Sequence, residues 1–582
     1  MLICRKLHFV KSIFKFIFFS FSIIILINCA RTGRPKGGPK DEDAPLFVTS
    51  NPPYETLNFD KKEIKLNFNE FIKLKNFNKQ LFVSPPLKNP LLVSPQGSAS
   101  KFLTLDILDT LKKNTTYIIN FGNAIEDNNE GNKLESFKYV FSTGNYIDSL
   151  STSGEIRDAY LDERPKNTNV LLYKIDSSFT DSIVYNKKPN YVTSAQDTSS
   201  FNFTNLQEGK YLLIALKETA SDYLFSSRED KIGFYNDTIR LPEDSIVKNP
   251  LLLFKETQPY KFKRGKEISK GKIAFGYQGE ITDLQVKITS ETPKDFKSIS
   301  KFEIDKDTLN YWFKPFETDS LNFVVTNQKV MDTITVKLRK KKIDSLLFNS
   351  SIGRILHFRD TLFINTNNPV IRIDTSKITL TNKDTLTIPY SSYISKKENK
   401  IAILFDKKPE QKYFLNILPS AIFDIFEQKN DTLNFNFITK EIEDYGKITI
   451  QIDNQTSQNL ILELLEGKNK NTLVERKLVT SSEEIQFNLL EPKKYYVRAI
   501  IDANKNNKWD TGNFLLKQQP EKIIYYSEEL ELRANYFLDG NVFTIKIQNR
   551  PESSYVNFVS FFGGIRAIIS NYKNFFIDLI TP

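Results

Sequence analysis

The stretch TYIINFGNAIEDNNEGNKLESFKYVFSTG, residues 116–144, recurs further along the chain as KYFLNILPSAIFDIFEQKNDTLNFNFIT, residues 412–439. The two copies match at Tyr117 and Tyr413, Asn120 and Asn416, residues 125–127 and 422–424, Phe141 and Phe437, and Thr143 and Thr439. Apolar and polar residues alternate within each copy, which is the pattern of a strand with one buried face. The repeat predicts two copies of one β-rich module.

A second repeat stands beside the first. FTNLQEGKYLLIALKE, residues 203–218, recurs as FNLLEPKKYYVRAIID, residues 487–502. Each copy of this second repeat follows a copy of the first. Two different modules therefore occur twice in the same order.

The rest of the chain shows the same alternation of apolar and polar residues. Short runs such as residues 64–68, IKLNF, alternate in polarity and are separated by turns rich in Asn, Asp, Gly and Pro. A chain of 582 residues exceeds what one hydrophobic core can hold, so several domains are expected. The predicted fold class is all-β, a tandem of β-sandwiches.

The first module resembles the bacterial Ig-like domains of S-layer and surface proteins. The motifs that carry the resemblance are the strand EIKLNFNEFI, VSPP at residues 83–86, Leu111 with the NTTY strand at residues 114–117, a turn through Asp127, Gly131 and Asn132, and a closing FSTG. The resemblance covers residues 46–145. The second copy, residues 346–442, keeps the strands and loses the Gly-Asn turn. We call these the first and second Ig-like modules.

The second module resembles transthyretin-like β-sandwiches related to the regulatory domain of carboxypeptidases. GEIRDA (154–159) and NVLLYKI (169–175) supply strands, and Gly209 can take the positive φ that the following hairpin requires. We call residues 150–255 and 445–547 the first and second transthyretin-like modules. Such modules usually serve as binding domains or as spacers between other domains, and they rarely catalyse reactions. Residues 256–345, the middle module, are β-rich and resemble no family.

The N-terminus has the layout of a secretory signal. Four basic residues precede a twelve-residue apolar run, residues 16–27, which is too short to span a membrane as a helix. Residues 26–29, LINC, resemble a bacterial lipobox, which implies a signal peptide of residues 1–28 and a diacylglycerol on Cys29. An ordinary signal peptide with a chance cysteine is the alternative. Residues 29–45 predict a flexible tether like those of Bacteroidota lipoproteins.

Signal removal leaves little for nucleophilic or metal chemistry. Cys4 and His8 lie in the signal, so Cys29 and His357 become the remaining cysteine and histidine. His357 sits in the alternating run ILHFRDTLFI, which predicts a structural role. No disulfide is expected, and a Ser/His/Asp or Cys/His catalytic site would have to use His357.

The charge balance is mildly basic. The net charge is +11, and the signal contributes four of the 81 cations, which leaves 77 basic against 70 acidic residues. The dense basic run of residues 340–342 is interpreted as a solvated domain junction rather than as a nucleic-acid site.

A loop of residues 502–513, DANKNNKWDTGN, has the spacing of a calcium loop. Its candidate ligands at positions 1, 3, 5, 7 and 9 are Asp502, Asn504, Asn506, the carbonyl of Lys508, and Asp510. Asn507 replaces the usual Gly and can visit the left-handed region. Asn513 stands where a closing Glu is expected, so a polar hairpin loop is the alternative to a structural Ca²⁺ site. Trp509 is predicted to pin the loop to its sandwich in either case.

Two further features stand out. The tripeptide Asp-Ser/Thr-apolar occurs twelve times, for example at residues 109–111 and 237–239. It resembles the O-glycosylation acceptor of Bacteroidota, and it equally fits a turn capped by Asp before a strand.

Residues 551–582 contain an apolar, amphipathic pattern that predicts a short helical segment docking on a sandwich, a partner or the membrane interface.

These observations predict a non-catalytic protein, lipid-anchored at the outer membrane, that serves as a scaffold or protein-interaction module. An outer-membrane protein partner is expected, in an assembly or export machine. The sequence does not determine whether the protein faces the periplasm or the cell surface. No cofactor, nucleic acid or small-molecule substrate is expected. The alternative is a surface adhesin or glycan-binding lipoprotein, which calls for clustered aromatic side chains, whereas Trp312 and Trp509 lie far apart in sequence. A glycoside hydrolase with paired carboxylates is the least favoured hypothesis.

Overall fold

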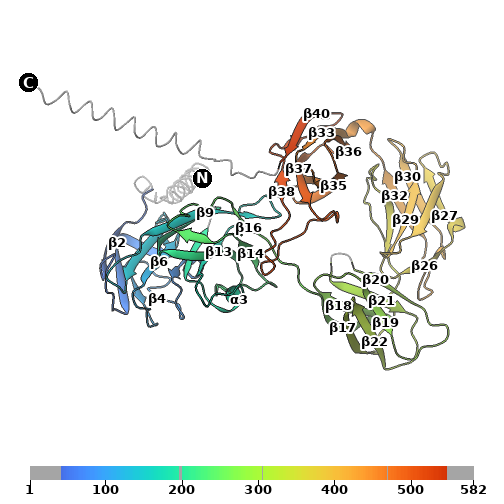
Figure 1. Ribbon diagram of the computed structural model, residues 1–582. Coiled ribbons are helices and arrows are strands. Elements are labelled where there is room, and N and C mark those ends of the chain that lie inside the picture. Colours follow the sequence, from blue (N-terminus) through green and yellow to red (C-terminus); the bar gives the residue numbers. More distant parts are fainter. Residues whose placement is uncertain (1–40, 196–198, 304–305, 468, 547–582) are drawn as a thin grey trace, which may run out of the picture. The chain divides into compact units, whose positions relative to one another are not determined.

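The computed structural model describes residues 41–195, 199–303, 306–467 and 469–546 (Figure 1). The signal peptide, Cys29, most of the tether and residues 551–582 lie outside the described residues. The described chain divides into two compact units, one of residues 41–81, 89–110 and 120–139 and the other of the remaining described residues. Nearly every regular element is a strand, so the all-β fold class is confirmed.

The first Ig-like module contains eight strands. They are β1 (Phe47–Asn51), β2 (Glu63–Leu74), β3 (Phe82–Ser84), β4 (Leu92–Ser94), β5 (Ser100–Asp106), β6 (Thr116–Gly122), β7 (Ile125–Asp127) and β8 (Phe137–Ser142), with a short helix α2 (Phe77–Gln80). One sheet has the order β1-β2-β5-β4 with β7 pairing β2, and the other has the order β3-β6-β8. The alternation of β2 buries Ile64, Leu66 and Phe68 on one face, as the sequence predicts.

The second Ig-like module repeats this topology. Its strands are β24 (Phe348–Ser350), β25 (Leu362–Thr366), β26 (Val370–Ile373), β27 (Ile378–Asn382), β28 (Tyr390–Ile394), β29 (Lys400–Phe405), β30 (Lys412–Ile417), β31 (Ile422–Asp424) and β32 (Leu433–Ile438), with the 3-10 helix η1 (Thr375–Lys377). The sheet orders are β24-β25-β29-β28, β26-β31 and β27-β30-β32. Strands β25 and β26 together take the place of the long β2. The sequence repeat is therefore a repeat of strand order.

The two transthyretin-like modules also share one topology. The first contains β9 (Leu150–Asp158), β10 (Thr168–Lys174), β11 (Tyr191–Ala195), β12 (Ser200–Leu206), β13 (Gly209–Lys217), β14 (Lys231–Phe234), β15 (Ile239–Leu241) and β16 (Leu251–Leu253), with helix α3 (Ile183–Asn186). The second contains β33 (Gly446–Asn454), β34 (Asn459–Glu466), β35 (Thr472–Val479), β36 (Glu483–Leu490), β37 (Lys494–Asp502), β38 (Ile523–Tyr525), β39 (Leu530–Glu531) and β40 (Phe537–Ile545), preceded by the 3-10 helix η2 (Ile442–Asp444).

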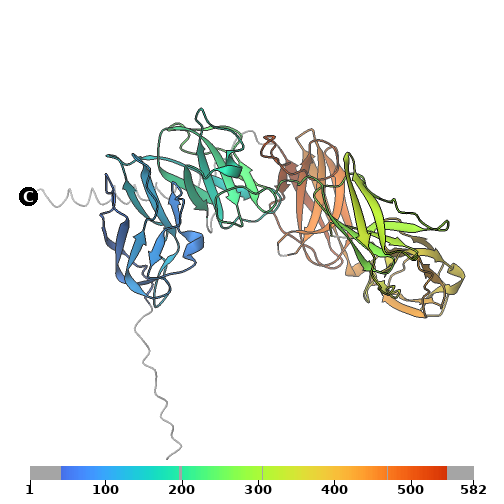
Figure 2. The same cartoon turned by 90° about the horizontal axis from the view of Figure 1, so that it is seen from below.

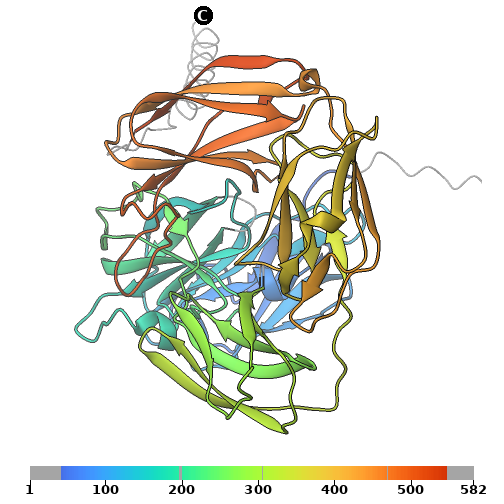
Figure 3. The ribbon, with the colours of Figure 1, turned by 90° about the vertical axis from the view of Figure 1, so that its right-hand side faces the viewer.

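In the first of these modules the sheets have the orders β11-β10-β13-β14, with β15 on β13, and β12-β9-β16. In the second they have the orders β35-β34-β37-β38, with β39 on β37, and β36-β33-β40. In both modules the last strand pairs in parallel with the first, β16 with β9 and β40 with β33. Gly209 has the positive φ expected of it, +153°. Figure 3 shows the second module, in orange and red, as facing layers of strands.

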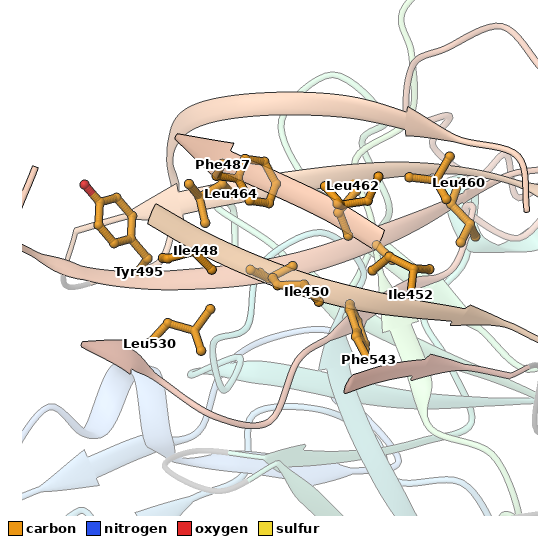
Figure 4. Packing of buried hydrophobic residues seen from close by; sticks show 14 of the residues in the cluster. Ile448, Ile450, Ile452, Leu460, Leu462, Leu464, Phe487, Tyr495, Leu530 and Phe543 are labelled. Carbon is orange, nitrogen blue, oxygen red and sulfur yellow. The ribbon is translucent and has the colours of Figure 1, made fainter. Parts of the chain in front are cut away.

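Side chains from both sheets form the core of the second transthyretin-like module (Figure 4). Ile448, Ile450 and Ile452 project from β33 toward Leu460, Leu462 and Leu464 of β34, and all six are at most 1% exposed. This is the pattern that period-two strands give when each sheet turns one face inward.

The middle module has two sheets of its own (Figure 2). Its strands are β17 (Lys261–Ser269), β18 (Lys272–Gln278), β19 (Leu284–Ile288), β20 (Ser298–Phe302), β21 (Thr308–Phe313), β22 (Ser320–Asn327) and β23 (Val330–Lys337). The sheet orders are β17-β18-β21-β20 and β19-β22-β23. Every sheet of the described residues draws its strands from a single module.

Candidate functional site

The residues matched between the Ig-like copies have structural roles. The hydroxyl of Tyr117 accepts the backbone N–H of Lys112 at 2.9 Å, and that of Tyr413 accepts the backbone N–H of Lys408 at 2.8 Å. Thr143 and Thr439 likewise donate to the carbonyls of the same two lysines. These side chains fix one loop in each copy, which accounts for their recurrence in the repeat.

The expected Asp-Gly-Asn turn is also structural. The Asp127 carboxylate accepts backbone N–H groups of Asn129, Glu130 and Asn132 at 2.6 to 2.7 Å, and Gly131 has φ +81°. In the copy without Gly-Asn, the equivalent carboxylate of Asp424 accepts the N–H groups of residues 426 and 428. The turn closes in both copies through the aspartate.

His357 is held by its neighbours. Its Nδ1 accepts the backbone N–H of Arg359 at 3.0 Å, and its ring lies edge-on to Tyr445 at 4.6 Å between centroids. Burial lowers the pKa of the imidazole. These contacts agree with the structural role predicted for it.

The most elaborate cluster of polar contacts lies in the loop of residues 503–522, between β37 and β38. The Asp502 carboxylate accepts the N–H groups of Asn506 and Asn507 at 3.1 and 2.9 Å. The side-chain amides of Asn504 and Asn506 both donate to Oδ2 of Asp510 at 2.6 Å. The loop therefore brings together four of its five candidate ligands, and Asn507 adopts φ +62°, as predicted.

Glu521 closes the loop, a role that sequence reasoning missed. Its carboxylate accepts the N–H groups of Ala503 at 2.9 Å and Asp510 at 3.1 Å. Trp509 donates its indole N–H to the Glu521 carbonyl at 2.9 Å within the same loop, and its ring packs against the core of the first transthyretin-like module rather than on its own sandwich. Burial, and then the nearby carboxylates of Asp510 and Asp502, raise the pKa of Glu521.

The metal prediction for this loop remains a prediction. Lys508 directs its ammonium to Glu280 at 3.0 Å, and Asn513 uses its side-chain oxygen to accept the N–H of Leu516. The Asp502 and Asp510 oxygens are engaged by donors of the loop itself. Within the described part of the chain, no group of three or more His, Cys, Asp or Glu side chains is arranged to hold a metal ion.

The same loop buries itself in the first transthyretin-like module. Phe514 is 0% exposed and belongs to a core cluster with Phe234 and Phe254 of that module. Its ring meets Phe234 edge-on at 5.5 Å. Its backbone N–H donates to the buried Glu256 carboxylate at 2.7 Å. A side chain of one module thus completes the core of another.

Polar contacts surround this insertion. Thr511 donates to the Lys255 carbonyl at 2.8 Å, and the Gln519 amide donates to the Phe234 carbonyl at 2.9 Å. Lys517 pairs with Asp181 at 2.6 Å. A Cβ on Gly512 would lie 2.6 Å from the Phe254 ring and 2.7 Å from the carbonyl of Gln518, so a glycine is required where the loop passes the ring.

A buried guanidinium holds the second contact between these modules. Arg498 of β37, 2% exposed, pairs with Glu463 of β34 through Nε at 2.7 Å and Nη2 at 2.6 Å. Two of its donors reach across to Tyr160, Nη1 to the carbonyl at 3.0 Å and Nη2 to the hydroxyl at 2.7 Å, and Nη1 also donates to the Tyr525 hydroxyl at 3.1 Å. The Tyr160 ring also packs against Trp509 at 4.8 Å.

We call this set of contacts the junction. It is made by residues 470, 498 and 509–519 of the second transthyretin-like module against residues 160, 162, 181, 234, 254 and 255 of the first and against Glu256, which follows it directly. Separation of the modules would remove the Tyr160 acceptors from a charged donor, and hydrogen bonds to charged groups are stronger than those between neutral groups. The junction therefore favours a fixed pairing of two modules that the sequence places nearly 200 residues apart.

The Asp-Ser/Thr-apolar tripeptides lie largely where strands begin. Strands β9, β15, β21, β22, β25 and β32 each start at the second or third residue of such a tripeptide. None of the twelve hydroxyl-bearing residues is buried. The turn-and-strand interpretation accounts for these positions, and glycosylation remains a prediction.

Comparison with known proteins supports part of the predicted organisation. Residues 41–143 match the family model of a bacterial Ig-like domain, which confirms the first Ig-like module. No curated protein matches the chain.

Among solved structures, the chain is similar to an S-layer protein, rSbsC(31-844), at 11% identity over 84% of this chain and 68% of that chain, with a TM-score of 0.15. It is also similar to the I9-I11 tandem of titin, at 8% identity over 41% and 95%, with a TM-score of 0.12. A third likeness is to the major pilin subunit of Bacillus cereus, at 7% identity over 69% and 99%, with a TM-score of 0.12. Scores this low carry no argument about function.

Among the described residues, none of the helices has the length and hydrophobicity that a membrane-spanning helix requires.

Proposed function

We propose that this chain is a non-catalytic scaffold, anchored at the outer membrane through lipid on Cys29, that holds interaction surfaces for an outer-membrane protein partner. The observation that carries the proposal is the junction. It fastens the two transthyretin-like modules together, and the middle and second Ig-like modules lie between them in sequence.

Burial at the junction supports a permanent pairing. Phe514, fully buried, removes a large apolar side chain from water, an effect of about 1.5–3 kcal/mol for such a residue. The charged donors of Arg498 all find acceptors. A fixed pair of modules loses less conformational entropy when a partner binds than a chain of independent modules does.

The two tryptophans do not provide a glycan-binding surface. Stacking sites for sugars need exposed aromatic rings. Trp312 is 2% exposed and Trp509 packs against Tyr160. Neither tryptophan is therefore displayed on an open surface in the described chain.

The test is purification of the tagged full chain from its own membranes in mild detergent, with co-purifying proteins identified by mass spectrometry. Recovery of a stoichiometric outer-membrane protein, lost from a variant without residues 551–582, supports the scaffold. Recovery of the chain alone, together with a specific signal on glycan arrays, favours the adhesin.

A further inference from the structure

The middle module carries a concentrated basic edge. Residues 261–272 and 337–342 together contain eleven Lys or Arg residues against one carboxylate, Glu267, a net charge of +10. The whole chain has a net charge of +11. Eighteen residues therefore account for nearly all of the excess positive charge.

The fold brings the two segments together. The backbone N–H of Lys270 donates to the carbonyl of Lys342 at 3.1 Å, and that of Arg339 donates to the Glu267 carboxylate at 2.8 Å. The ammonium of Lys341 donates to the carbonyls of Glu267 and Ile268, both at 2.8 Å. Glu267, the one carboxylate in these segments, is thus buried and already engaged.

Most of the cations remain exposed and unpaired. We call the following nine exposed residues the basic edge: Lys261, Lys263, Arg264, Lys266, Lys270, Lys337, Arg339, Lys340 and Lys342. None of them forms an ion pair with a carboxylate of the described residues, although 21 ion pairs occur elsewhere in that part of the chain. Nine like charges on one edge repel one another unless an external anion neutralises them.

Aliphatic side chains lie among these cations. Ile268, which is 43% exposed, lies two residues after Lys266 on β17 and two residues before Lys270, which follows the strand, and Ile343, 38% exposed, follows Lys342. Strand β17 is an edge strand of its sheet (Figure 1). Nine residues of strand extend over roughly 30 Å, so the cations form a row rather than a pocket.

We propose that the basic edge binds the surface of an anionic phospholipid membrane. A row of Lys and Arg can contact several phosphate headgroups at once, and each cation near such a surface contributes about fivefold in affinity. Exposed isoleucines among the cations suit insertion at the headgroup level. An acidic protein partner would instead favour a bounded patch with hydrogen-bonding side chains of both kinds. This inference stands apart from the anchor at Cys29, because it rests on charges of the middle module.

The test measures binding of the purified full chain to vesicles. One set contains phosphatidylcholine alone, and the other contains phosphatidylglycerol as well, each in low and high salt. The lipid anchor and residues 551–582 contribute to both sets, so the ratio of the two affinities isolates the charge effect. Melting temperatures and circular dichroism of all variants establish that each is folded.

The variant Arg264→Gln, Lys266→Gln, Lys340→Gln, Lys342→Gln removes four charges from the basic edge. A matched control removes four exposed, unpaired lysines from other modules: Lys210→Gln, Lys248→Gln, Lys383→Gln, Lys396→Gln. Both variants have the same net charge.

We expect the parent and the control to prefer phosphatidylglycerol vesicles by roughly tenfold or more in low salt, and the basic-edge variant to lose that preference. Equal losses in the two variants would overturn the inference, because net charge alone would then explain binding. So would equal binding of the parent to both vesicles, or binding to soluble polyglutamate with none to vesicles. None of these outcomes bears on whether a protein partner co-purifies.

Discussion

The hydrogen bond between Arg498 and the Tyr160 hydroxyl offers a sensitive probe of the junction. Tyr160→Phe removes that hydroxyl alone. The ring keeps its packing on Trp509, and the Tyr160 carbonyl still accepts from Arg498 and from Tyr525 at 2.9 Å. A neutral side chain that fits the same space leaves the rest of the junction intact.

The expected magnitude follows from the chemistry of the bond. Hydrogen bonds to charged groups contribute about 1.5–3 kcal/mol, and this bond is short, 2.7 Å, with a donor on a guanidinium that is 2% exposed. The equilibrium for opening the junction should rise by roughly 10- to 150-fold. The urea dependence scales with the surface exposed, so opening the junction has a shallower slope than unfolding a domain, and the opening midpoint should shift to a clearly lower urea concentration.

Trp509 emission reports the opening directly, because its ring lies on Tyr160 and its indole N–H is bonded within the loop. In a Trp312→Phe background it is the remaining tryptophan. Urea titration of this protein, of Tyr160→Phe and of Arg498→Lys, singly and together, yields a double-mutant cycle.

Arg498→Lys keeps the positive charge but loses the planar guanidinium that donates to the Tyr160 hydroxyl. Removing that hydroxyl by Tyr160→Phe should therefore have little further effect on the opening equilibrium once Lys stands at position 498. Tyr211→Phe is the matched control, because its hydroxyl donates to the Gln207 carbonyl within one module, and its effect should add to that of Arg498→Lys. Additive effects of Tyr160→Phe and Arg498→Lys would refute the reasoning.

Four further predictions concern the same region and the anchor. Gly512→Ala should lower the melting temperature and disturb Trp509 emission, since a Cβ would meet the Phe254 ring at 2.6 Å. Burial raises the pKa of Glu256, so the folded chain binds that proton more tightly than the unfolded chain does. The folded chain therefore loses stability as the pH rises through the raised pKa. Thermal melts should show Glu256→Gln increasingly more stable than the parent from about pH 4 to 7. Calcium should raise the melting temperature of the parent and not of Asp502→Ala or Asp510→Ala. Cys29→Ala should abolish incorporation of an alkyne-labelled fatty acid.

Each of these has an outcome that would contradict it. Gly353→Ala is the control for the glycine, because nothing lies within 4 Å of its Cβ position, and equal effects of the two would remove the steric argument. A melting difference for Glu256→Gln that stays constant with pH would contradict the burial argument. No calcium effect on the parent retires the metal site, and label retained without Cys29 excludes it as the lipidated residue.

The sequence predicts the all-β fold class because its repeats and its alternation of apolar and polar residues are local patterns. Tyr117 and Tyr413 match in sequence and make the same hydrogen bond, and the second repeat pairs Tyr211 with Tyr495, whose hydroxyls donate to the equivalent carbonyls of Gln207 and Glu491. Each of these tyrosines bonds to a residue only a few positions away in the sequence. Alternation and turn chemistry are therefore enough to find them.

The junction escaped prediction because its contacts join residues distant in the chain. Tyr160 carries no motif, and Phe514 follows a loop whose polar residues attract attention to calcium instead. The signal that was present is the glycine in the Trp-Asp-Thr-Gly-Asn run, since Gly512 is required by a ring of another module. A loop that is longer than its counterpart between β13 and β14 is a second signal.

The most direct test of the junction uses its own ion pairs. A zero-length carbodiimide cross-linker joins Lys to Asp or Glu side chains in contact, and mass spectrometry of the digested full chain identifies the pairs. Lys517 lies 2.6 Å from Asp181, and Lys470 lies 2.6 Å from Asp162, both across the two modules. We predict both links, at yields like that of Lys494 with Glu529 within one module. Recovery of the Lys494–Glu529 link without either of the others would contradict the junction and the scaffold built on it.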